Sequence, residues 1–367
     1  MRLSRYEAFE KIAESPIFIV LGGAFGSEAK GAYIAWMADP NNPNNLQRTT
    51  GRSHLSVVRT GGPQAGHCVI YKEKVYAMRQ VPCGWVNPDA MLYMGPGSLI
   101  DVEVMLQEIK MVEEATGQSL KYRLMIDRHA TIVEEKHREA EHDLVKGIGS
   151  TGEGVGAAQA DKVMRRAKVA KDVEELKQYI GDVGAELREQ VRGGRTTVLI
   201  ESTQGWGLSL NGSFYPTCTS RDINPGQVLS DSGLPSNFQH SVVLIMRTFP
   251  IRVAGPSGPM SEEVTWEQLA EQSGGYIKPE KTTVTKRIRR IAKWNPELAR
   301  MAVEATNADA IVLTFFDYVR PDLANAAALD ADALNTIYQF EQDAGAPILF
   351  VSTGFQRIVP LVSKSLV

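Results

Sequence analysis

The chain has 367 residues, of which 43% are hydrophobic and 23% are charged, and this composition is that of an ordinary globular protein. It excludes collagenous, disulfide-rich and disordered proteins. A formal net charge of -3 gives no global electrostatic reason to bind nucleic acid or an anionic membrane, so we expect neither as a partner. Any anionic ligand must therefore be held by a local cluster of side chains.

The cysteines and the N-terminal segment indicate the cellular compartment in which the protein works. Cys68, Cys83 and Cys218 lack the spacing of metal ligands, which argues against a disulfide framework or a structural zinc site. The N-terminal residues form a charged, helix-like pattern without the apolar stretch and cleavage site of a signal peptide. No apolar run approaches the roughly 20 residues that cross a bilayer. We therefore expect a cytoplasmic protein.

The first predicted element is a buried strand at residues 17–21 (IFIVL), closed by two glycines and followed by a helix at residues 31–37. Residues 39–45 resemble a loop, and residues 55–80 a β-ribbon inserted on the main sheet. Further apolar runs predict strands at residues 91–94, 124–126, 198–200, 242–246, 311–315 and 348–351. Helical patterns occur at residues 102–114, 133–146, 173–191, 296–306 and 331–342. This alternation predicts an α/β fold with a mostly parallel central sheet and flanking helices.

The number of domains is not decided by length, which allows one or two. No internal repeat and no break in composition divides the chain. We therefore predict a single elaborated domain over residues 1–367.

A glycine-rich loop at residues 22–31 (GGAFGSEAKG) joins the first strand to the first helix. Such a turn presents backbone N–H groups at the positive end of a helix, and Lys30 adds a mobile cation, so the loop suits a polyphosphate. The Walker A pattern is not met, because Ala29 precedes the lysine and Gly31 follows it. The alternative is a tight turn with a solvated lysine. We interpret the segment as part of a P-loop-like nucleotide-binding fold.

Further segments carry polar groups suited to a ligand. His67 follows a glycine turn and can donate a hydrogen bond to a phosphate oxygen, although an isolated histidine is more often simply packed or solvated. Loops at residues 149–156 and 201–205 combine glycines with hydroxyl and amide groups that can cradle a phosphate, or else only form turns. Residues 283–290 hold three arginines and one lysine, which suits a small dianionic substrate, the alternative being a solvated basic face.

Taken together and in order, nine segments spread over nearly the whole chain resemble the adenylosuccinate synthetase family. They are residues 26–32 (GSEAKGA), 64–67 (QAGH), 150–154 (STGEG), 161–166 (DKVMRR), 202–205 (STQG), 215–220 (YPTCTS), 283–290 (TVTKRIRR), 314–317 (TFFD) and 352–354 (STG). One such motif is weak, whereas nine in register are a specific signal.

The resemblance implies a ligase that phosphorylates the 6-oxygen of a purine nucleotide with a nucleoside triphosphate and then replaces that phosphate with the amino group of L-aspartate. Lys30 and Mg²⁺ would offset charge on the transferring phosphoryl group, and His67 would stabilise that charge or act as a general acid. Ser27 and the carbonyl of Gly66 would bind the Mg²⁺. The resemblance also implies a homodimer in which Arg165 reaches the neighbouring active site.

The resemblance assigns three groups of binding residues as well. The purine monophosphate would contact Ser27, Gln64, Ser150, Thr151, Arg165, Gln204, Thr219 and Arg287. Aspartate would contact Thr283, Thr285, Arg287 and Arg289. The nucleoside triphosphate would contact Gly26, Glu28, Ala29, Lys30, Gly31, Phe315, Asp317, Ser352 and Gly354.

Three departures from the family pattern bear on substrate choice. Ser27 stands where the family has the aspartate that removes the purine N1 proton, and a hydroxyl is a poor general base unaided. Gln64 and Glu153 replace an asparagine and an arginine. Phe315 replaces the lysine that reads guanine, so we expect ATP or dATP to serve as phosphate donor at least as well as GTP.

A serine at position 27 resembles the viral branch of the family, which makes 2-aminoadenine nucleotides by joining aspartate to dGMP. The smaller side chain would leave room for the 2-amino group of guanine. We therefore expect a ligase that forms N6-succino-2-amino-2′-deoxyadenylate from dGMP and L-aspartate, in the host cytoplasm if the chain is viral. The alternatives are an ordinary adenylosuccinate synthetase acting on IMP and a catalytically inactive nucleotide-binding regulator.

Overall fold

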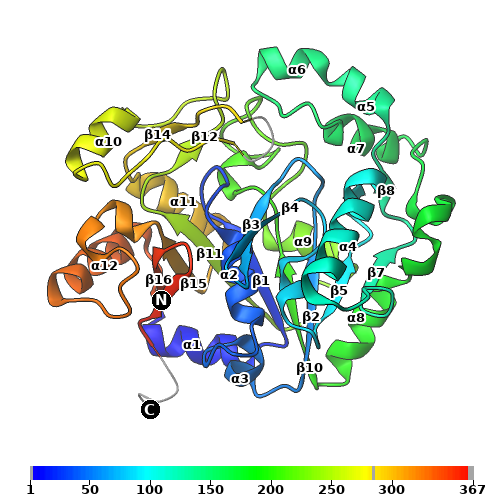
Figure 1. Cartoon of the computed structure of the whole chain (residues 1–367), viewed down its shortest axis with the longest axis horizontal. Coiled ribbons are helices and arrows are strands. Elements are labelled where there is room, and N and C mark those ends of the chain that lie inside the picture. The colour runs from blue at the N-terminus through cyan, green and yellow to red at the C-terminus, as the bar shows by residue number, and fades with distance from the viewer. Residues whose placement is uncertain (1–2, 283–285, 363–367) are drawn as a thin grey trace.

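A ten-stranded sheet forms the centre of the computed structural model, which describes residues 3–282 and 286–362 (Figure 1). The strands are β1 (Ile17–Gly22), β2 (His54–Arg59), β3 (His67–Tyr71), β4 (Lys74–Met78), β5 (Met91–Met94), β6 (Leu99–Ile100), β7 (Leu124–Asp127), β8 (Thr131–Ile132), β9 (Ile180–Gly181), β10 (Thr196–Glu201), β11 (His240–Arg247), β12 (Ile251–Arg252), β13 (Glu263–Val264), β14 (Arg290–Ala292), β15 (Ala310–Thr314), β16 (Ile348–Gly354) and β17 (Arg357–Pro360). The order in the main sheet is β17-β16-β15-β11-β1-β10-β2-β5-β7-β9. Every neighbouring pair in it is parallel except β16 with β17, which confirms the predicted fold class.

Helices cover both faces of this sheet. The α-helices are α1 (Arg5–Glu14), α2 (Lys30–Ala38), α3 (Leu46–Thr50), α4 (Val102–Thr116), α5 (Glu135–Ala140), α6 (His142–Gly147), α7 (Val155–Val163), α8 (Val183–Arg192), α9 (Pro225–Asp231), α10 (Trp266–Gln272), α11 (Pro296–Thr306) and α12 (Ala331–Ala344). Short 3₁₀ helices are η1 (Cys83–Val86), η2 (Ala170–Asp172), η3 (Glu174–Tyr179), η4 (Trp206–Leu208), η5 (Phe316–Tyr318) and η6 (Pro321–Leu323). None of the helices within the described ranges combines the length and the hydropathy needed to cross a lipid bilayer.

Successive side chains of a strand point to opposite sides of the sheet, and helices cover both sides here. The strands are therefore buried on both faces. In β1, Phe18 and Val20 pack into one core with α1, α2 and α4, whereas Ile17, Ile19 and Leu21 pack into a second core with α8, α9, α11 and α12. This explains why the strand is a continuous apolar run. The result is a three-layer arrangement of helices, sheet and helices.

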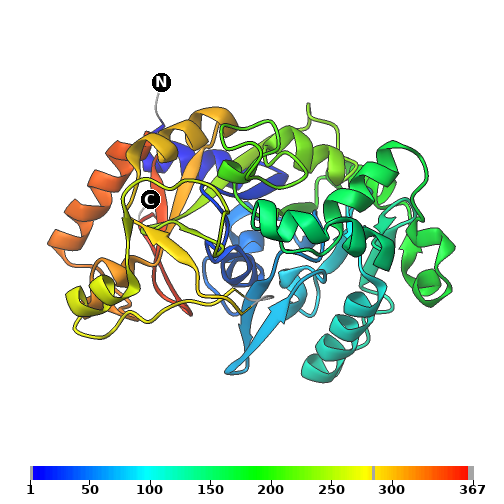
Figure 2. The same cartoon turned by 90° about the horizontal axis from the view of Figure 1, so that it is seen from above.

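The carboxyl ends of the central strands lie at one edge of the sheet, where open α/β folds bind ligands. Strand β1 lies between β10 and β11, so the loops that follow these three strands meet there. Two groups of smaller elements lie above this edge, β12 and β14 with α10 on one side and α5, α6 and α7 on the other (Figures 1 and 2). Together they frame the region where the predicted motifs come together.

Three predicted elements differ from the structure. Residues 55–59 belong to β2 inside the main sheet, and the ribbon contains only β3 and β4. The predicted helix at residues 133–146 is split at Glu141, whose buried carboxylate accepts hydrogen bonds from Gly154 and Ala157 N–H groups across 2.9 and 3.1 Å. The predicted helix at residues 173–191 is interrupted by β9, and Asp182 then caps α8 by accepting from Ala185 N–H across 2.9 Å.

Candidate active site

A pocket of about 440 Å³ opens at the carboxyl ends of the central strands. It is lined by residues from the loops after β1, β2 and β10 and from the loops at residues 148–151 and 215–220. The predicted site residues that line it are Gly26, Ser27, Lys30, Gln64, Gly66, His67, Ser150, Thr151, Gln204, Thr219 and Arg289. Segments up to 262 residues apart therefore meet at one site, as their motifs predicted.

The glycine loop after β1 is held by a buried ion pair. Glu28 accepts from the Ala24 N–H across 2.6 Å and from Lys30 Nζ across 3.1 Å, and both charged side chains are almost fully buried. Lys30 lines the pocket, but it is fixed and not mobile, so that part of the sequence interpretation is wrong. A side chain at Gly31 would place its Cβ 2.5 Å from the Cβ of His67, so glycine is needed where α2 passes β3.

Ser27 lies at the tip of this loop, exposed and in a left-handed conformation with φ 55°. Its Oγ accepts a hydrogen bond from Nη1 of Arg289, the residue predicted to bind aspartate. Its carbonyl accepts from Nη1 of Arg247 across 3.0 Å, and Arg247 is in turn paired with Glu280 at 2.6 Å. Ser27 therefore contacts two arginines, which places cationic groups beside the position where the family carries a carboxylate.

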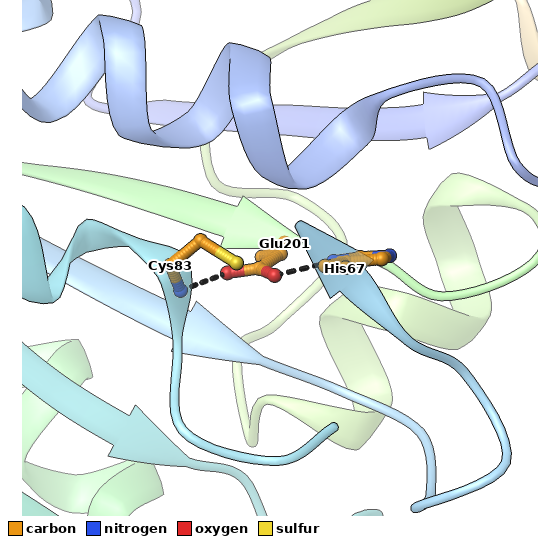
Figure 3. A group of neighbouring side chains, drawn as sticks. All are labelled: His67, Cys83 and Glu201. Atoms are coloured by element: carbon orange, nitrogen blue, oxygen red, sulfur yellow. Dashed lines mark hydrogen bonds and ion pairs between the residues drawn. The ribbon is translucent and has the colours of Figure 1, made fainter. Parts of the chain in front are cut away.

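His67 is held by a buried carboxylate (Figure 3). Oε1 of Glu201 lies 2.5 Å from His67 Nδ1 and 2.8 Å from Arg59 Nη1, and Oε2 accepts from the Cys83 N–H across 2.7 Å. Burial and the Arg59 charge lower the pKa of His67 to about 4. Although burial alone would raise it, Arg59 and His67 lower the pKa of Glu201 to about 2. A neutral His67 therefore donates from Nδ1 to an ionised Glu201, and its Nε2 points away from that carboxylate.

His67, Cys83 and Glu201 also place three potential metal-ligand atoms within 4.8 Å of one another. The Arg59 guanidinium already pairs with Glu201, and burial raises the pKa of the Cys83 thiol well above its usual value. A cation would meet a like charge and a protonated thiol there. The cluster is therefore better explained as the support of His67 than as a metal centre.

Arg252 forms part of the pocket wall and was not predicted. Its guanidinium lies 4.2 Å from the ring centroid of Phe25 and donates to the carbonyls of Thr217 and Pro259 across 2.7 and 2.9 Å. Burial lowers its pKa to about 10. It thus ties the glycine loop to the two loops on the opposite side of the pocket.

The residues after β15 and at the end of β16 that are predicted to bind the nucleoside triphosphate do not line the pocket. Phe315 and Asp317 follow β15, and Ser352 and Gly354 end β16, its parallel neighbour. The Phe315 ring stacks on Arg247, 3.8 Å from its guanidinium carbon. Because Arg247 also contacts Ser27, it connects the pocket with the residues that follow β15.

Two residues predicted to bind the purine monophosphate lie outside the pocket. Arg165 is exposed just beyond the end of α7, and Arg287 is exposed and does not line the cavity. Thr283 and Thr285 lie outside the described residues. Outside the binding predictions, Glu153 forms an ion pair with Arg79, which accounts for a carboxylate where the family has an arginine.

The family is decided by comparison with known proteins. A model of the adenylosuccinate synthetase family matches residues 19–173 and 167–324. The adenylosuccinate synthetase of Methanocaldococcus jannaschii is 36% identical over 345 residues, which cover 92% of this chain and 93% of that protein. The chain belongs to the adenylosuccinate synthetase family.

Adenylosuccinate synthetases are ligases of purine nucleotide biosynthesis that form a carbon–nitrogen bond between aspartate and a purine nucleotide, and they use Mg²⁺ generally. Two solved structures share the fold of this family member. The succinoaminodeoxyadenylate synthetase of cyanophage S-2L, bound to dGMP and to dATP as an energy donor, has a TM-score of 0.77 and 24% identity, covering 96% of this chain and 97% of that one. A fully ligated adenylosuccinate synthetase from Plasmodium falciparum has a TM-score of 0.80 and 20% identity, covering 95% and 100%.

Sequence reasoning missed the buried partners of the predicted residues. Arg59, Glu201, Arg247 and Arg252 each end a strand, and each supports the wall of the synthetase pocket or a residue on it. For Arg59, Glu201 and Arg247, the signal that could have found them is a charged residue that closes an apolar run at the carboxyl end of a parallel strand. Arg252 ends the short antiparallel strand β12 and carries no such signal.

Proposed function

We propose that this adenylosuccinate synthetase homologue joins L-aspartate to the 6-position of dGMP, with ATP or dATP as the phosphate donor. The observation that carries the proposal is Ser27, a small neutral side chain on the pocket wall where the family pattern has an aspartate. A carboxylate there would crowd a purine 2-amino group, whereas a hydroxyl leaves space. The cyanophage structure, whose fold this chain shares, is itself bound to dGMP and dATP, which supports the proposal.

The proposed reaction has two steps. The 6-oxygen of the purine attacks the γ-phosphorus of the donor as the N1 proton is lost, and the nucleoside diphosphate leaves. The amino group of aspartate then attacks C6, and inorganic phosphate leaves with the former 6-oxygen. Lys30 and His67 line the pocket where charge on the phosphoryl group would need to be stabilised, and Arg289 is placed to bind an aspartate carboxylate.

Mg²⁺ would be held by the Ser27 hydroxyl and the Gly66 carbonyl, together with phosphate oxygens of the nucleotides. Both protein groups are oxygen donors on the same pocket wall, and Mg²⁺ prefers oxygen ligands shared with substrate phosphates. When bound, the ion would neutralise charge on the transferring phosphoryl group. The contact from Arg289 to Ser27 Oγ would have to be exchanged for the ion.

The ordinary use of IMP is the second candidate, and it is favoured by the archaeal adenylosuccinate synthetases to which the chain is similar. Both candidates lose the N1 proton of the purine, so both need a group that accepts it. Position 27 offers no carboxylate for this task, and the arginines that contact Ser27 add positive charge and no base. The physical reason to place dGMP ahead of IMP is therefore the space that Ser27 leaves for the 2-amino group, which IMP lacks.

We further propose a homodimer in which Arg165 contacts the nucleotide of the neighbouring subunit. Arg165 is exposed, and the adjacent Val163 and Met164 are apolar side chains with exposed fractions of 63% and 58%. Such a patch is typical of a surface that another chain covers. Mixing Arg165→Leu with Arg289→Leu, each expected to bind one substrate more weakly, should restore some activity at subsaturating substrate, and no recovery would count against the dimer.

The proposed function is tested by an assay that crosses IMP, GMP and dGMP with ATP, dATP and GTP in the presence of aspartate and Mg²⁺. Aspartate-dependent phosphate release with dGMP and with ATP or dATP is the expected result. Efficient turnover of IMP without turnover of dGMP would establish the second candidate. Release of phosphate with none of the nine pairs would indicate an inactive regulator.

A further inference from the structure

Tyr276 and Asp317 make a polar contact to which the proposed reaction assigns no role. Tyr276 lies in the loop that follows α10, and its hydroxyl donates to Oδ2 of Asp317 across 2.7 Å. The second oxygen, Oδ1, is buried and makes no hydrogen bond within the part of the chain that the structure describes. Because an unpartnered buried oxygen is unfavourable, Oδ1 is an atom that a donor group on a ligand would complete.

The contact lies beside the aromatic surface after β15. The Phe315 ring faces Arg247, and Arg247 is held by Glu280, which also accepts from the Tyr318 hydroxyl across 2.9 Å. Asp317 lies between Phe316 and Tyr318 in η5, so a carboxylate oxygen without a partner among the described residues lies next to aromatic residues. This combination suits a planar ring that carries an amino group.

The position of Tyr276 is set by the small core beneath it. The next residue, Ile277, is buried against Trp266 and Leu269 in the cluster that joins α10 to β12 and β14. Burial and the neighbouring Asp317 raise the pKa of Tyr276 to about 12. The hydroxyl therefore keeps its proton at neutral pH and is the donor in its contact with Asp317.

We infer that Tyr276 is a specificity-determining residue that selects adenine over guanine in the phosphate donor. A carboxylate that recognises guanine uses both oxygens, one for N1–H and one for the 2-amino group. Tyr276 occupies Oδ2, so only Oδ1 remains, and this matches the single exocyclic amino group of adenine. The inference rests on the proposed function, because it takes Asp317 as the group that faces the donor's base.

The test is a binding measurement, which does not depend on turnover. Isothermal titration calorimetry with MgATP and MgGTP is performed on the full-length wild type, on Tyr276→Phe and Tyr276→Leu, and on Tyr338→Phe. Tyr338 is an exposed tyrosine on α12 and serves as the matched control. Loss of the Tyr276 hydroxyl should reduce the preference for ATP by about tenfold or more, since Oδ2 becomes free for guanine, and the control should not change it.

An unchanged preference in both Tyr276 variants would overturn the inference, as would a wild type that prefers GTP. Phosphate release with dGMP and aspartate is measured on the same preparations. An ATP preference that weakens in the Tyr276 variants, without any turnover by the wild type, would reject the proposed function and support the inference. Turnover by the wild type with an unaltered preference in the variants would reject the inference alone, and binding of neither nucleotide would reject both.

Discussion

The pocket around Ser27 and the region around Asp317 lie at the same edge of the sheet but differ in how they are prepared for a ligand. In the pocket, Lys30 and His67 are held by buried carboxylates and still line a cavity of about 440 Å³. Around Asp317, aromatic rings and Arg247 pack against one another, and Oδ1 is covered. The proposed purine monophosphate would therefore enter a formed site, whereas the base of the proposed phosphate donor would reach Asp317 only after a neighbouring side chain moves.

The largest effect is expected from His67, because Glu201 holds it on the pocket wall where the proposed reaction would transfer the phosphoryl group. His67→Asn should lower kcat by about 10³-fold, within the range for a residue that acts on charge or protons in the transition state. His142→Asn, an exposed histidine on α6, is the matched control. Initial rates of phosphate release measure both, and a loss below about fivefold would remove His67 from the chemistry.

The role of Glu201 as the buried partner of His67 and Arg59 can be tested by measuring the free energy of unfolding. Glu201→Gln leaves the buried Arg59 without its charged partner and should lower the free energy of unfolding by about 3 kcal/mol at pH 7. The pKa of Glu201 is lowered on folding from 4.5 to about 2, so its contribution is complete above pH 4.5 and is lost as the pH falls toward 2. Urea denaturation at pH 7 and pH 4 should show a smaller difference between wild type and variant at pH 4. An equal or larger difference at pH 4 would contradict this assignment.

Arg289 tests the aspartate side of the pocket. Arg289→Leu should raise KM for aspartate by about 10²-fold with a smaller change in kcat, because a charge-assisted contact to a carboxylate is removed. Arg195→Leu, with an exposed side chain before β10, controls for the general loss of a positive charge. Unchanged saturation by aspartate in Arg289→Leu would show that the contact with Ser27 has another purpose.

The smallest effect is expected in the region around Asp317. Phe315→Lys restores a donor for the guanine 6-oxygen and should increase the use of GTP relative to ATP by about tenfold. Competition between the two donors in the phosphate-release assay measures the ratio. A ratio equal to that of the wild type would mean that Phe315 does not face the base.

Features that depend on neighbouring residues in the sequence could be predicted from the sequence. The parallel sheet followed from apolar runs such as residues 17–21, and the glycine loop and His67 followed from motifs, because both are local in sequence. A short apolar strand followed by a hairpin has the same sequence pattern as one longer ribbon, so the sequence predicts residues 55–59 in the ribbon, whereas they belong to the main sheet. That the whole chain forms one domain stays a prediction.

Contacts between distant segments could not be predicted from one sequence. Arg289 and Arg247 contact Ser27 across 262 and 220 residues, and no local pattern specifies such a pairing. The partners of a buried charge depend on which strand ends the fold brings together. The residues that line the pocket were therefore found more completely than the residues that hold them in place.

The central claim is that Ser27 makes room for the 2-amino group of dGMP. Its most direct test compares kcat/KM for dGMP and IMP between the wild type and Ser27→Asp, at saturating ATP and aspartate. The account predicts that the wild type prefers dGMP and that Ser27→Asp loses dGMP activity by about 10²-fold or more, since a carboxylate would crowd that group. A wild type that uses IMP well and ignores dGMP would contradict it.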